Sequence, residues 1–420
     1  MDSIRQYVNA IRIIDGHEHL ATPQIRLREN HDFFSLLHYL ESDLITAGMR
    51  RGDLTRRHEA SDEEKARLFL QYWNLTKNTT YARSFKTAME DLYGMQEWSV
   101  EGILQTNDKV LAATRNPDWY EHVLAERSGI DLAFTLIQTT KLGFDRFRPI
   151  MFLDFTFNLR TSKDIRAVER AAGGSPEGDF RSYLDTVDAL LHKYAQEGMP
   201  ATKLGHAYWR TLQCGNPDAM DAASVYDRLN ALADGEEMTI EKTRPLQDYL
   251  IRHVIERSAA RGLPIQIHTG HHETSVSGDG NVITNSNVEG LIPLLLAYPE
   301  AKFVLLHAGL PYHQTYLSIA KNFPNVYADF TWVYIISPTA AKQILHQIVE
   351  MVPMNKIQGF GGDYNYIEGT YAHQKLARRL VGETLSEKVA EGALSEEEAC
   401  EFAERIFRTN LIELYKLDGL

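Results

Sequence analysis

Cysteine is scarce in this chain, and two other features are absent from it. Only Cys214 and Cys400 occur in 420 residues, too few for a disulfide framework and typical of a reducing compartment. No stretch approaches the roughly 18 consecutive apolar residues of a membrane-spanning helix. The first residues also lack the basic-then-apolar order of a signal peptide. We therefore expect a cytoplasmic protein with no membrane partner.

Positive charge is also in deficit. The chain has 44 Lys and Arg residues against 57 Asp and Glu residues, a formal net charge of −13, and no tract rich in Lys or Arg. This balance argues against a nucleic-acid partner. A hydrophobic content of 44% and a charged content of 24% are ordinary for a globular protein. We expect a small-molecule substrate as the principal partner.

Two histidines follow the first apolar run of the chain. Residues 11–14 lead directly into the segment Asp15-Gly16-His17-Glu18-His19, and so short a β-branched run predicts a buried strand. Side chains alternate between the two faces of a strand, so His17 and His19 should project the same way from its carboxyl end. Two imidazoles placed like this can chelate one divalent cation.

Three later apolar runs also end at a residue that can bind a metal. Residues 263–267 end at His268, residues 302–306 end at His307, and residues 356–362 end at Asp363. A histidine at the end of a single strand is common in packing roles. Four strands that each finish in His or Asp are hard to explain by packing alone, so the pattern favours a metal site.

With these residues in this order, the chain resembles the amidohydrolase superfamily, in particular the branch that consists of a metal-bearing barrel with little else. That family carries H-x-H on the first barrel strand, His on the fifth and sixth strands and Asp on the eighth. The resemblance implies an α/β protein with a (β/α)8 (TIM) barrel and a metal held by His17, His19, His268 and Asp363. It also implies catalytic roles for Asp363, which would move protons, and for His307, which would orient water and polarise a substrate carbonyl.

The remaining pattern fits one barrel domain over residues 1–420. Strand-like runs alternate with helical ones, which indicates a parallel sheet. Residues 30–119 read as helices, including a capping box at Ser61 and Glu64. This segment is too long for a normal loop, so we expect a helical insertion after the first strand that serves as a lid. The other predicted strands span residues 129–137, 149–155, 201–208, 263–268, 302–307, 325–330 and 356–363, and a helical C-terminal tail spans 374–415.

The metal and its number are left open by the sequence. Imidazole and carboxylate ligands with an open position suit Zn²⁺ best, with Mn²⁺ or Fe²⁺ as alternatives. Lys203 lies on the predicted fourth strand, where binuclear members of the family carry a carbamylated lysine. We prefer one ion, with Lys203 binding a substrate carboxylate or serving structure, and expect two ions if Lys203 is carbamylated. Further predicted substrate contacts are Arg210, an anion-binding fork, and Arg28, His271 and Trp332.

Three reactions are compatible with such a site. The leading hypothesis is that a metal-activated water hydrolyses an amide, ester or lactone bond in a small substrate. Anionic substrates are included in this class. The second is aldose–ketose isomerisation of a uronic acid, because the long insertion and the segment around Tyr93 resemble the uronate isomerases. The third is non-oxidative decarboxylation of an aromatic acid. Barrels of this kind often self-associate, so a homo-oligomer is also compatible with the sequence.

Overall fold

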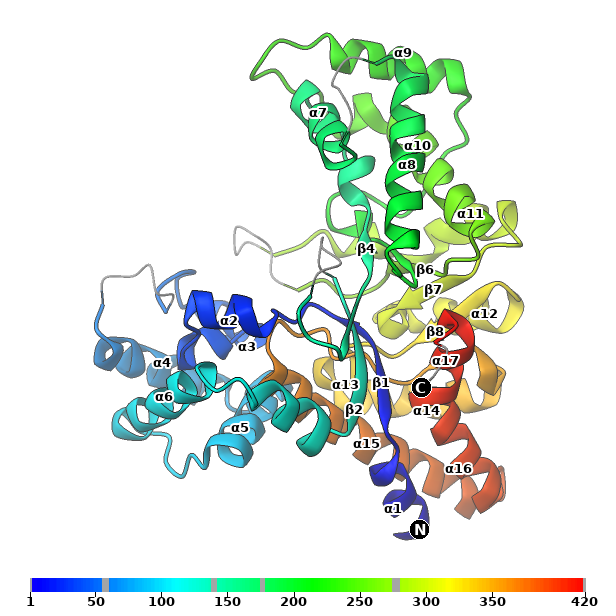
Figure 1. The fold of residues 1–420 in the computed structure, drawn as a ribbon. Coiled ribbons are helices and arrows are strands. Elements are labelled where there is room, and N and C mark those ends of the chain that lie inside the picture. The colour runs from blue at the N-terminus through cyan, green and yellow to red at the C-terminus, as the bar shows by residue number, and fades with distance from the viewer. Residues whose placement is uncertain (1, 55–59, 137–141, 174–177, 274–279, 418–420) are drawn as a thin grey trace.

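The strands of this computed structural model form two parallel sheets that together make the barrel. The structure describes residues 2–54, 60–136, 142–173, 178–273 and 280–417. One sheet has the order β1-β2-β3 and the other has the order β4-β5-β6-β7-β8-β9 (Figure 1). The strands are β1 Ile13–Glu18, β2 Ile130–Thr135, β3 Phe147–Pro149, β4 Met151–Phe152, β5 Thr202–Leu204, β6 Ile265–His268, β7 Phe303–Leu306, β8 Val326–Asp329 and β9 Ile357–Gln358.

Backbone hydrogen bonds join the two sheets into a ring. Strands β3 and β4 are separated only by Ile150, whose N–H donates to Thr135 O over 3.0 Å, so they make up one interrupted third strand. At the other edge, Gly16 N donates to Phe360 O over 3.0 Å, and Asp363 N donates to His17 O over 3.0 Å. The segment after β9 therefore runs beside β1, and the predicted eight-stranded barrel is confirmed.

The last helix of the chain fills the inside of the barrel. Leu411, Leu414 and Tyr415 of α17 (Asn410–Tyr415) form one buried cluster with side chains from the strands, among them Ile14 and Leu306. The neighbouring strand residues Ile13 and Leu305 belong to the larger core under the outer helices. This alternation is the period-two pattern of strands. The C-terminal tail thus supports the floor of the barrel.

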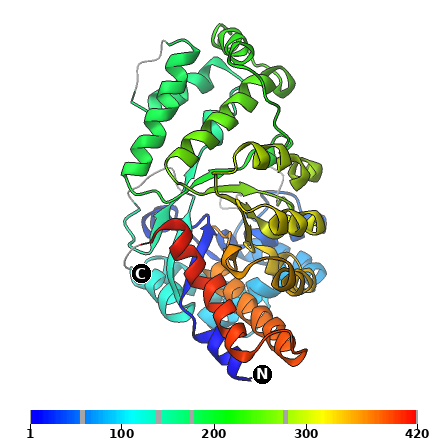
Figure 2. The same ribbon diagram turned by 90° about the vertical axis from the view of Figure 1, so that its right-hand side faces the viewer.

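Helices surround the strands on the outside, as Figure 2 shows for one flank of the molecule. Contacts between helices and strands and between neighbouring helices keep this outer layer together. The α-helices are α1 Asp2–Ala10, α2 Pro23–Glu29, α3 Tyr39–Thr46, α4 Asp62–Thr76, α5 Thr80–Tyr93, α6 Val100–Thr114, α7 Ser162–Ala171, α8 Phe180–Gln196, α9 Ala219–Asn230, α10 Ile240–Ala260, α11 Ile292–Ala297, α12 His313–Asn322, α13 Val333–Ile336, α14 Pro338–Met351, α15 Ile367–Ala390, α16 Glu396–Glu404 and α17.

The segment between β1 and β2 is helical, as the sequence predicts. Helices α2 to α6 lie together at one side of the barrel, at the left of Figure 1. The predicted capping box is present, because Glu64 N donates to Ser61 Oγ and Ser61 N donates to the Glu64 carboxylate. Helix α5 packs against α15, which ties this segment to the tail of the chain.

Several boundaries differ from those expected. The predicted third strand continues to residue 155, but the chain leaves the sheet after Phe152 and makes a 3₁₀ turn at Asp154–Thr156. The predicted fourth strand ends at Leu204, before a second 3₁₀ turn at His206–Tyr208. Residues 137–141, which include the end of the predicted second strand, lie outside the described residues. Among the helices of the described residues, none is long and apolar enough to cross a membrane.

Candidate functional site

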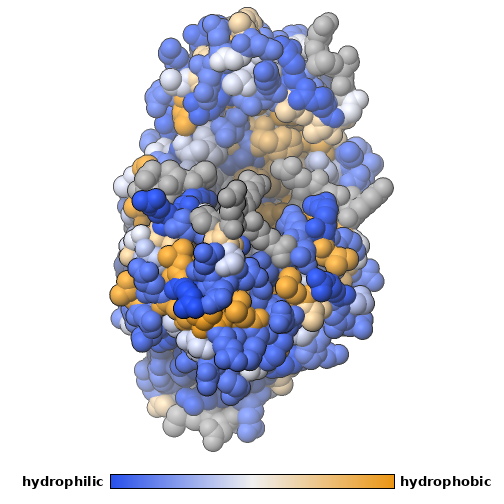
Figure 3. Space-filling model, turned by 90° about the vertical axis from the view of Figure 1, so that its left-hand side faces the viewer, coloured by the Kyte–Doolittle hydropathy of each residue, from blue (hydrophilic) through white to orange (hydrophobic). Residues whose placement is uncertain are grey.

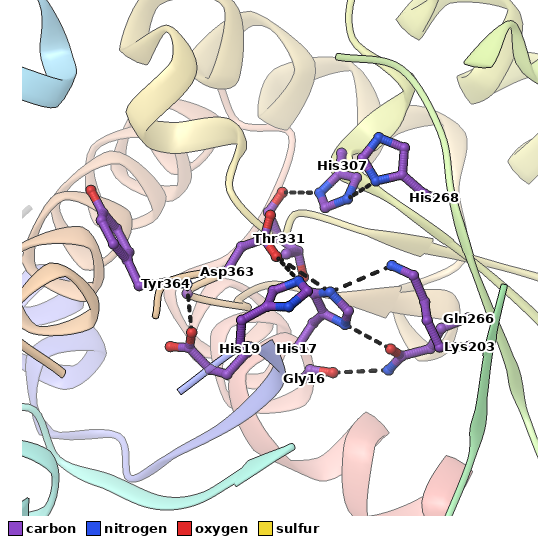
Figure 4. A network of polar contacts seen from close by, with 12 residues as sticks. Gly16, His17, His19, Lys203, Gln266, His268, His307, Thr331, Asp363 and Tyr364 are labelled. Atoms are coloured by element: carbon purple, nitrogen blue, oxygen red, sulfur yellow. Dashed lines mark hydrogen bonds and ion pairs between the residues drawn. The ribbon is translucent and has the colours of Figure 1, made fainter. Parts of the chain in front are cut away.

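Three of the predicted metal ligands meet at the carboxyl ends of the first and last strands. His17 Nε2 lies 3.3 Å from Asp363 Oδ1, and His19 Nε2 lies 3.2 Å from the same oxygen (Figure 4). One ligand atom from each of these three residues lies within 4.8 Å of the others. A register shift in β1 between Asp15 and Glu18 and the left-handed backbone of Asp363, with φ of 60°, turn these side chains toward one another.

The carboxylate of Asp363 is buried, and its two oxygens differ in their contacts. Oδ2 lies 3.0 Å from the Tyr39 hydroxyl of α3, which also donates to Asp363 O, whereas among the described residues Oδ1 has no hydrogen-bond partner. Burial alone would raise the pKa of Asp363, but His17 and His19 beside it hold that pKa well below its usual range. Asp363 is therefore ionised at neutral pH, and its free oxygen faces two imidazoles.

Gln266 of β6 fixes the orientation of His17. The Gln266 amide nitrogen donates to Gly16 O over 2.9 Å and to the Tyr415 hydroxyl over 3.0 Å. Both amide hydrogens are then occupied, so Gln266 Oε1 is the acceptor that lies 2.9 Å from His17 Nδ1. His17 accordingly carries its proton on Nδ1, and the Lys203 ammonium, 3.4 Å away, can donate to the lone pair on Nε2. Burial lowers the pKa of His17 to about 4, which keeps the ring neutral.

His268 and His307 form a second pair of facing imidazoles. His268 Nδ1 lies 2.9 Å from His307 Nε2, while His307 Nδ1 contacts Thr331 O and His268 Nε2 contacts His271 O. Burial lowers the pKa of both rings well below the usual value. Two neutral rings carry two N–H groups, which the two carbonyls use. The facing nitrogens then present lone pairs to each other across 2.9 Å, which is shorter than the separation of two ligands on one metal ion.

Lys203 of β5 is buried beside the same cluster. Its ammonium nitrogen lies 3.4 Å from His17 Nε2, and in the described part of the chain it makes no ion pair within 4.0 Å. Burial lowers the pKa of Lys203 to about 8. The side chain therefore points into the barrel, and its charge is available to an anionic group that enters the site.

These groups line a cavity of about 210 Å³ at the mouth of the barrel. Figure 3 shows the neighbouring surface as largely hydrophilic, with apolar side chains visible inside a hollow in the upper half of the view. The polar lining residues lie on or shortly after β1, β5, β6 and β9, and the other lining residues are apolar or aromatic. The described lining residues are His17, His19, Leu136, Phe152, Lys203, Tyr208, His268 and Asp363.

The donor set fits a divalent cation. Neutral imidazoles and a carboxylate are ligands that Zn²⁺ prefers, and Asp363 Oδ1 is a buried, ionised oxygen without a hydrogen bond. A buried charge without a partner is costly, and a cation between Asp363, His17 and His19 would remove that cost. His268 lies outside this three-residue cluster but lines the same cavity.

The structure places two predicted substrate contacts away from the cavity. Arg210 is buried in an ion pair with Asp248, with 2.5 Å between Nη2 and Oδ1, and it also donates to Gln247. It does not line the cavity, because the chain leaves the sheet at Gly205 and turns the side chain toward α10. Arg28 lies on α2 with 74% of its side chain exposed, 3.7 Å from Glu29, and is likewise not a lining residue.

The other two predicted contacts lie next to the cavity wall. His271 is half-buried, accepts the His268 contact through its carbonyl, and has its ring 3.1 Å from a Glu273 oxygen. Trp332 is buried, packs edge-on against His307 and stacks on Tyr39 at a centroid distance of 4.8 Å. Both residues support the imidazole pair from behind and are absent from the described lining.

Three residues of the site were not predicted from the sequence. Tyr39 comes from the helical segment after β1 and contacts Asp363, whereas Gln266 and Tyr415 hold His17 through one amide. The position of Gln266 offered a signal, since it stands two residues before His268 on the same strand and therefore on the same face. Tyr39 and Tyr415 offered none, because each reaches the site from a distant helix.

Comparisons with known proteins agree with this architecture. A family model described as amidohydrolase matches residues 218–417. The fluG protein of Emericella nidulans is 28% identical over 181 residues, which cover 42% of this chain and 20% of that protein. A uronate isomerase of Brucella canis is 24% identical over 386 residues, 84% of this chain and 80% of that protein. These matches show that the carboxyl-terminal part of the chain is similar to amidohydrolases.

Solved structures show the same fold over nearly the whole chain. A uronate isomerase from Thermotoga maritima has a TM-score of 0.82 at 16% identity, over 98% of this chain and 96% of that one. A glucuronate isomerase from Caulobacter crescentus has a TM-score of 0.79 at 19% identity, over 100% and 94%. The chain spans only about a fifth of the fluG protein and about half (52%) of a uronate isomerase of Rhizorhabdus wittichii. The chain therefore shares its fold with the two solved structures.

Proposed function

We propose that this enzyme hydrolyses an amide, ester or lactone bond in a small anionic substrate, with the help of a divalent metal ion. The observation that carries the proposal is the convergence of His17, His19 and Asp363 on one wall of a cavity of about 210 Å³ that also holds the Lys203 ammonium. A cavity of this size favours a substrate of few atoms, or one reacting group of a larger molecule. Leu136 and Phe152 in the lining favour an apolar portion beside that group.

Each polar residue has a distinct role in this proposal. His17, His19 and Asp363, with His268 as a further ligand, hold the ion, which supplies Lewis acidity when bound. Asp363 accepts the proton of the attacking water and returns it to the leaving group, and the Tyr39 hydroxyl holds the carboxylate in place. Lys203 binds a negatively charged oxygen of the substrate. His307 orients the water, which can donate to its Nε2. The one N–H of the His307 ring is used by Thr331 O, so it does not polarise the carbonyl.

One ion per chain is the count that we propose, with Zn²⁺ the preferred metal. Lys203 then keeps its ammonium for the substrate. A second ion would need Lys203 as a carbamate, and its pKa of about 8 leaves part of the amine unprotonated at neutral pH and able to react with CO₂. Metal content measured with and without added bicarbonate distinguishes the two cases, because only carbamylation depends on bicarbonate.

Aldose–ketose isomerisation of a uronate is the second candidate. It is supported by the uronate isomerase relatives, among them the Brucella canis protein at 24% identity over most of both chains. A sugar acid presents several hydroxyl groups that need hydrogen-bond partners, which the histidines, Lys203 and Asp363 of the lining can supply. Among the described lining residues, Tyr208 is the sole hydroxyl group, and no side-chain amide lines the cavity.

A substrate panel tests the proposal directly. The metal-loaded enzyme is assayed on activated esters, lactones and N-acyl amino acids, and in parallel on glucuronate and galacturonate. We expect turnover of the esters, lactones or N-acyl amino acids. The variant Lys203→Met should lose activity only on the anionic substrates among them, since a neutral ester does not need the ammonium. Conversion of either uronate to a ketose, without any hydrolysis, would establish the second candidate and overturn the first.

A further inference from the structure

A second cavity, of about 650 Å³, lies at the opposite end of the barrel from Asp363. It is enclosed by α1, by the end of η2 (Glu121–Arg127) with the turn into β2, and by the middle of α15. These segments precede or flank the amino ends of β1 and β2, near the N-terminus in Figure 1. The charged residues that line it, which define the basic pocket, are Arg5, Arg12, Arg127, Lys375, Arg378 and Arg379, together with Glu126 and Glu383.

The buried member of the basic pocket has no carboxylate partner. Arg378 is only 6% exposed, and in the described residues it makes no ion pair within 4.0 Å. Its guanidinium donates to the carbonyls of Val8, Asn9 and Ser128 and to the Gln374 side chain. The Arg378 guanidinium has five N–H groups, and these four acceptors are the ones that the described residues supply. Burial and the nearby Arg12 charge lower the pKa of Arg378 to about 10, so it remains a cation at neutral pH.

Three further cations of the basic pocket have a distant carboxylate partner or none among the described residues. Arg5 has no ion pair or hydrogen bond of its side chain within the described part of the chain. Arg379 is exposed and lies 3.9 Å from Glu383. Arg127 donates to the Tyr371 hydroxyl and to Asp91 O, with no carboxylate partner among the described residues. Arg12 and Lys375, in contrast, are paired with Asp131 and Asp91.

This concentration of positive charge is exceptional in an acidic chain. The protein carries a net charge of −13, yet cations outnumber carboxylates in the lining of the basic pocket. A neighbouring cavity of about 350 Å³ shares Lys375 and Arg379 with it and adds Arg83. Like charges held together without counter-ions destabilise the fold, and an anion bound among them would reverse that effect.

We propose that the basic pocket binds a small organic polyanion, with phosphate groups or several carboxylates, at a site separate from the catalytic cavity. Guanidinium groups form two parallel hydrogen bonds to either kind of oxyanion. The volume of about 650 Å³ lies in the range of small-molecule sites. Arg5, Arg127 and Arg379 contact the ligand from three different elements, while Arg378 supplies fixed positive charge at the base of the pocket.

Calorimetric titration of the full, metal-loaded chain tests this site. Fructose 1,6-bisphosphate serves as the phosphate probe and tricarballylate as the carboxylate probe, and metal content is measured before and after to exclude chelation. We expect one molecule bound per chain, with an affinity that falls as NaCl is added. The double variant Arg5→Gln/Arg379→Gln should raise the dissociation constant about tenfold or more. The probe with the higher affinity identifies the class of oxyanion.

Two control variants decide where the probe binds. Arg28→Gln/Arg181→Gln removes two exposed helical arginines that have similarly weak ion pairs, at 3.7 and 3.6 Å, and should bind the probe as the wild type does. Lys203→Met removes the cation of the catalytic cavity and should also bind normally. Binding that survives in Arg5→Gln/Arg379→Gln, binding that disappears in Lys203→Met, or the absence of binding by both probes would each overturn the proposal.

Discussion

The catalytic cavity and the basic pocket contain buried charges of opposite sign, and among the described residues neither Asp363 nor Arg378 has a permanently charged partner within 4.0 Å. At the carboxyl ends of the strands, Asp363 is held ionised beside His17 and His19, and its Oδ1 has no hydrogen bond within the described part of the chain. At the amino ends, Arg378 donates to backbone carbonyls, and no described carboxylate lies within 4.0 Å of it. Such charges are costly unless something neutralises them. The first location therefore favours a bound cation and the second a bound anion.

A third buried charge shows what the chain does when no ligand is needed. Arg26 of α2 lies 2.8 Å from Glu368 of α15, and Tyr93 and Trp119 donate to the same carboxylate. Both partners of this pair are fully buried and the carboxylate has several donors. The sequence supplies a complete counter-ion here, in contrast to Asp363 and Arg378. Because the chain can supply a buried counter-ion, the lack of one among the described residues at Asp363 and at Arg378 points to a bound ligand at each.

Removal of the charge at Asp363 should have the largest effect. Asp363→Asn takes away the anionic ligand and the proton acceptor, so we expect the ion to be bound poorly or not at all and turnover to fall by about 10²–10⁴-fold or more. Asp154→Asn is the matched control, because Asp154 is a buried carboxylate that binds Gly205 N and Trp209. Metal analysis and steady-state assays check both variants. Near-normal activity in Asp363→Asn would refute its assignment.

The next largest effect should come from Gln266, which orients His17. Gln266→Leu removes the acceptor for His17 Nδ1–H, and loss of such an outer partner typically lowers metal affinity about 10–100-fold. Gln358→Leu is matched to it, because Gln358 is equally buried and contacts the same Tyr415 hydroxyl but not His17. Metal titration should separate the two variants. Equal affinities in both would mean that Gln266 serves packing alone.

At the other pole of the molecule, Arg378→Met should reduce stability. The carbonyls of Val8, Asn9 and Ser128 lose their donor, and unsatisfied buried acceptors cost about 1–3 kcal/mol. Chemical denaturation should show this loss without a change in metal content. A saturating polyanion should raise the unfolding midpoint of the wild type more than that of Arg378→Met. Equal shifts would remove Arg378 from the anion site.

The smallest effect expected is a pH dependence from the complete pair. Burial alone would raise the pKa of Glu368, but Arg26 holds that pKa below its usual value. A carboxyl with a lowered pKa stabilises the fold fully above its unfolded pKa of about 4.5 and loses that contribution as the pH falls through the folded pKa. The free energy of unfolding should therefore drop below pH 4.5, by on the order of 1 kcal/mol, more in the wild type than in Glu368→Gln. Parallel pH profiles would contradict this.

The sequence predicts the barrel well because its strands are short, apolar and separated by helical patterns. The ends of the strands were harder to predict. Residues 201–208 alternate in a way that suits a strand, but the chain leaves the sheet after Leu204 because Gly205 and the following 3₁₀ turn redirect it. That early exit is why Arg210, predicted to face the site, instead pairs with Asp248. The alternation of residues along a short segment does not predict an ion pair with a residue on another element.

The candidate site was predicted for residues that lie at strand ends and missed for those that reach it from helices. The H-x-H segment and Asp363 meet as expected, since carboxyl ends of barrel strands share one face. Tyr39 contacts Asp363 from 324 residues away in the chain, and Tyr415 reaches Gln266 from the last helix. Neither contact can be predicted from the spacing of apolar and polar residues along the sequence. The basic pocket was also missed, because its arginines are spread over three segments.

The metal content per chain is the first quantity to measure, because it shows whether His17, His19 and Asp363 hold an ion. Protein purified without chelators and reconstituted with Zn²⁺, Mn²⁺ or Fe²⁺ is freed of loose ions and measured by elemental analysis. We expect about one tightly held divalent ion per chain, which Asp363→Asn loses. A wild-type protein that retains no ion after reconstitution with any of the three metals would contradict the assignment of His17, His19 and Asp363 as a metal site.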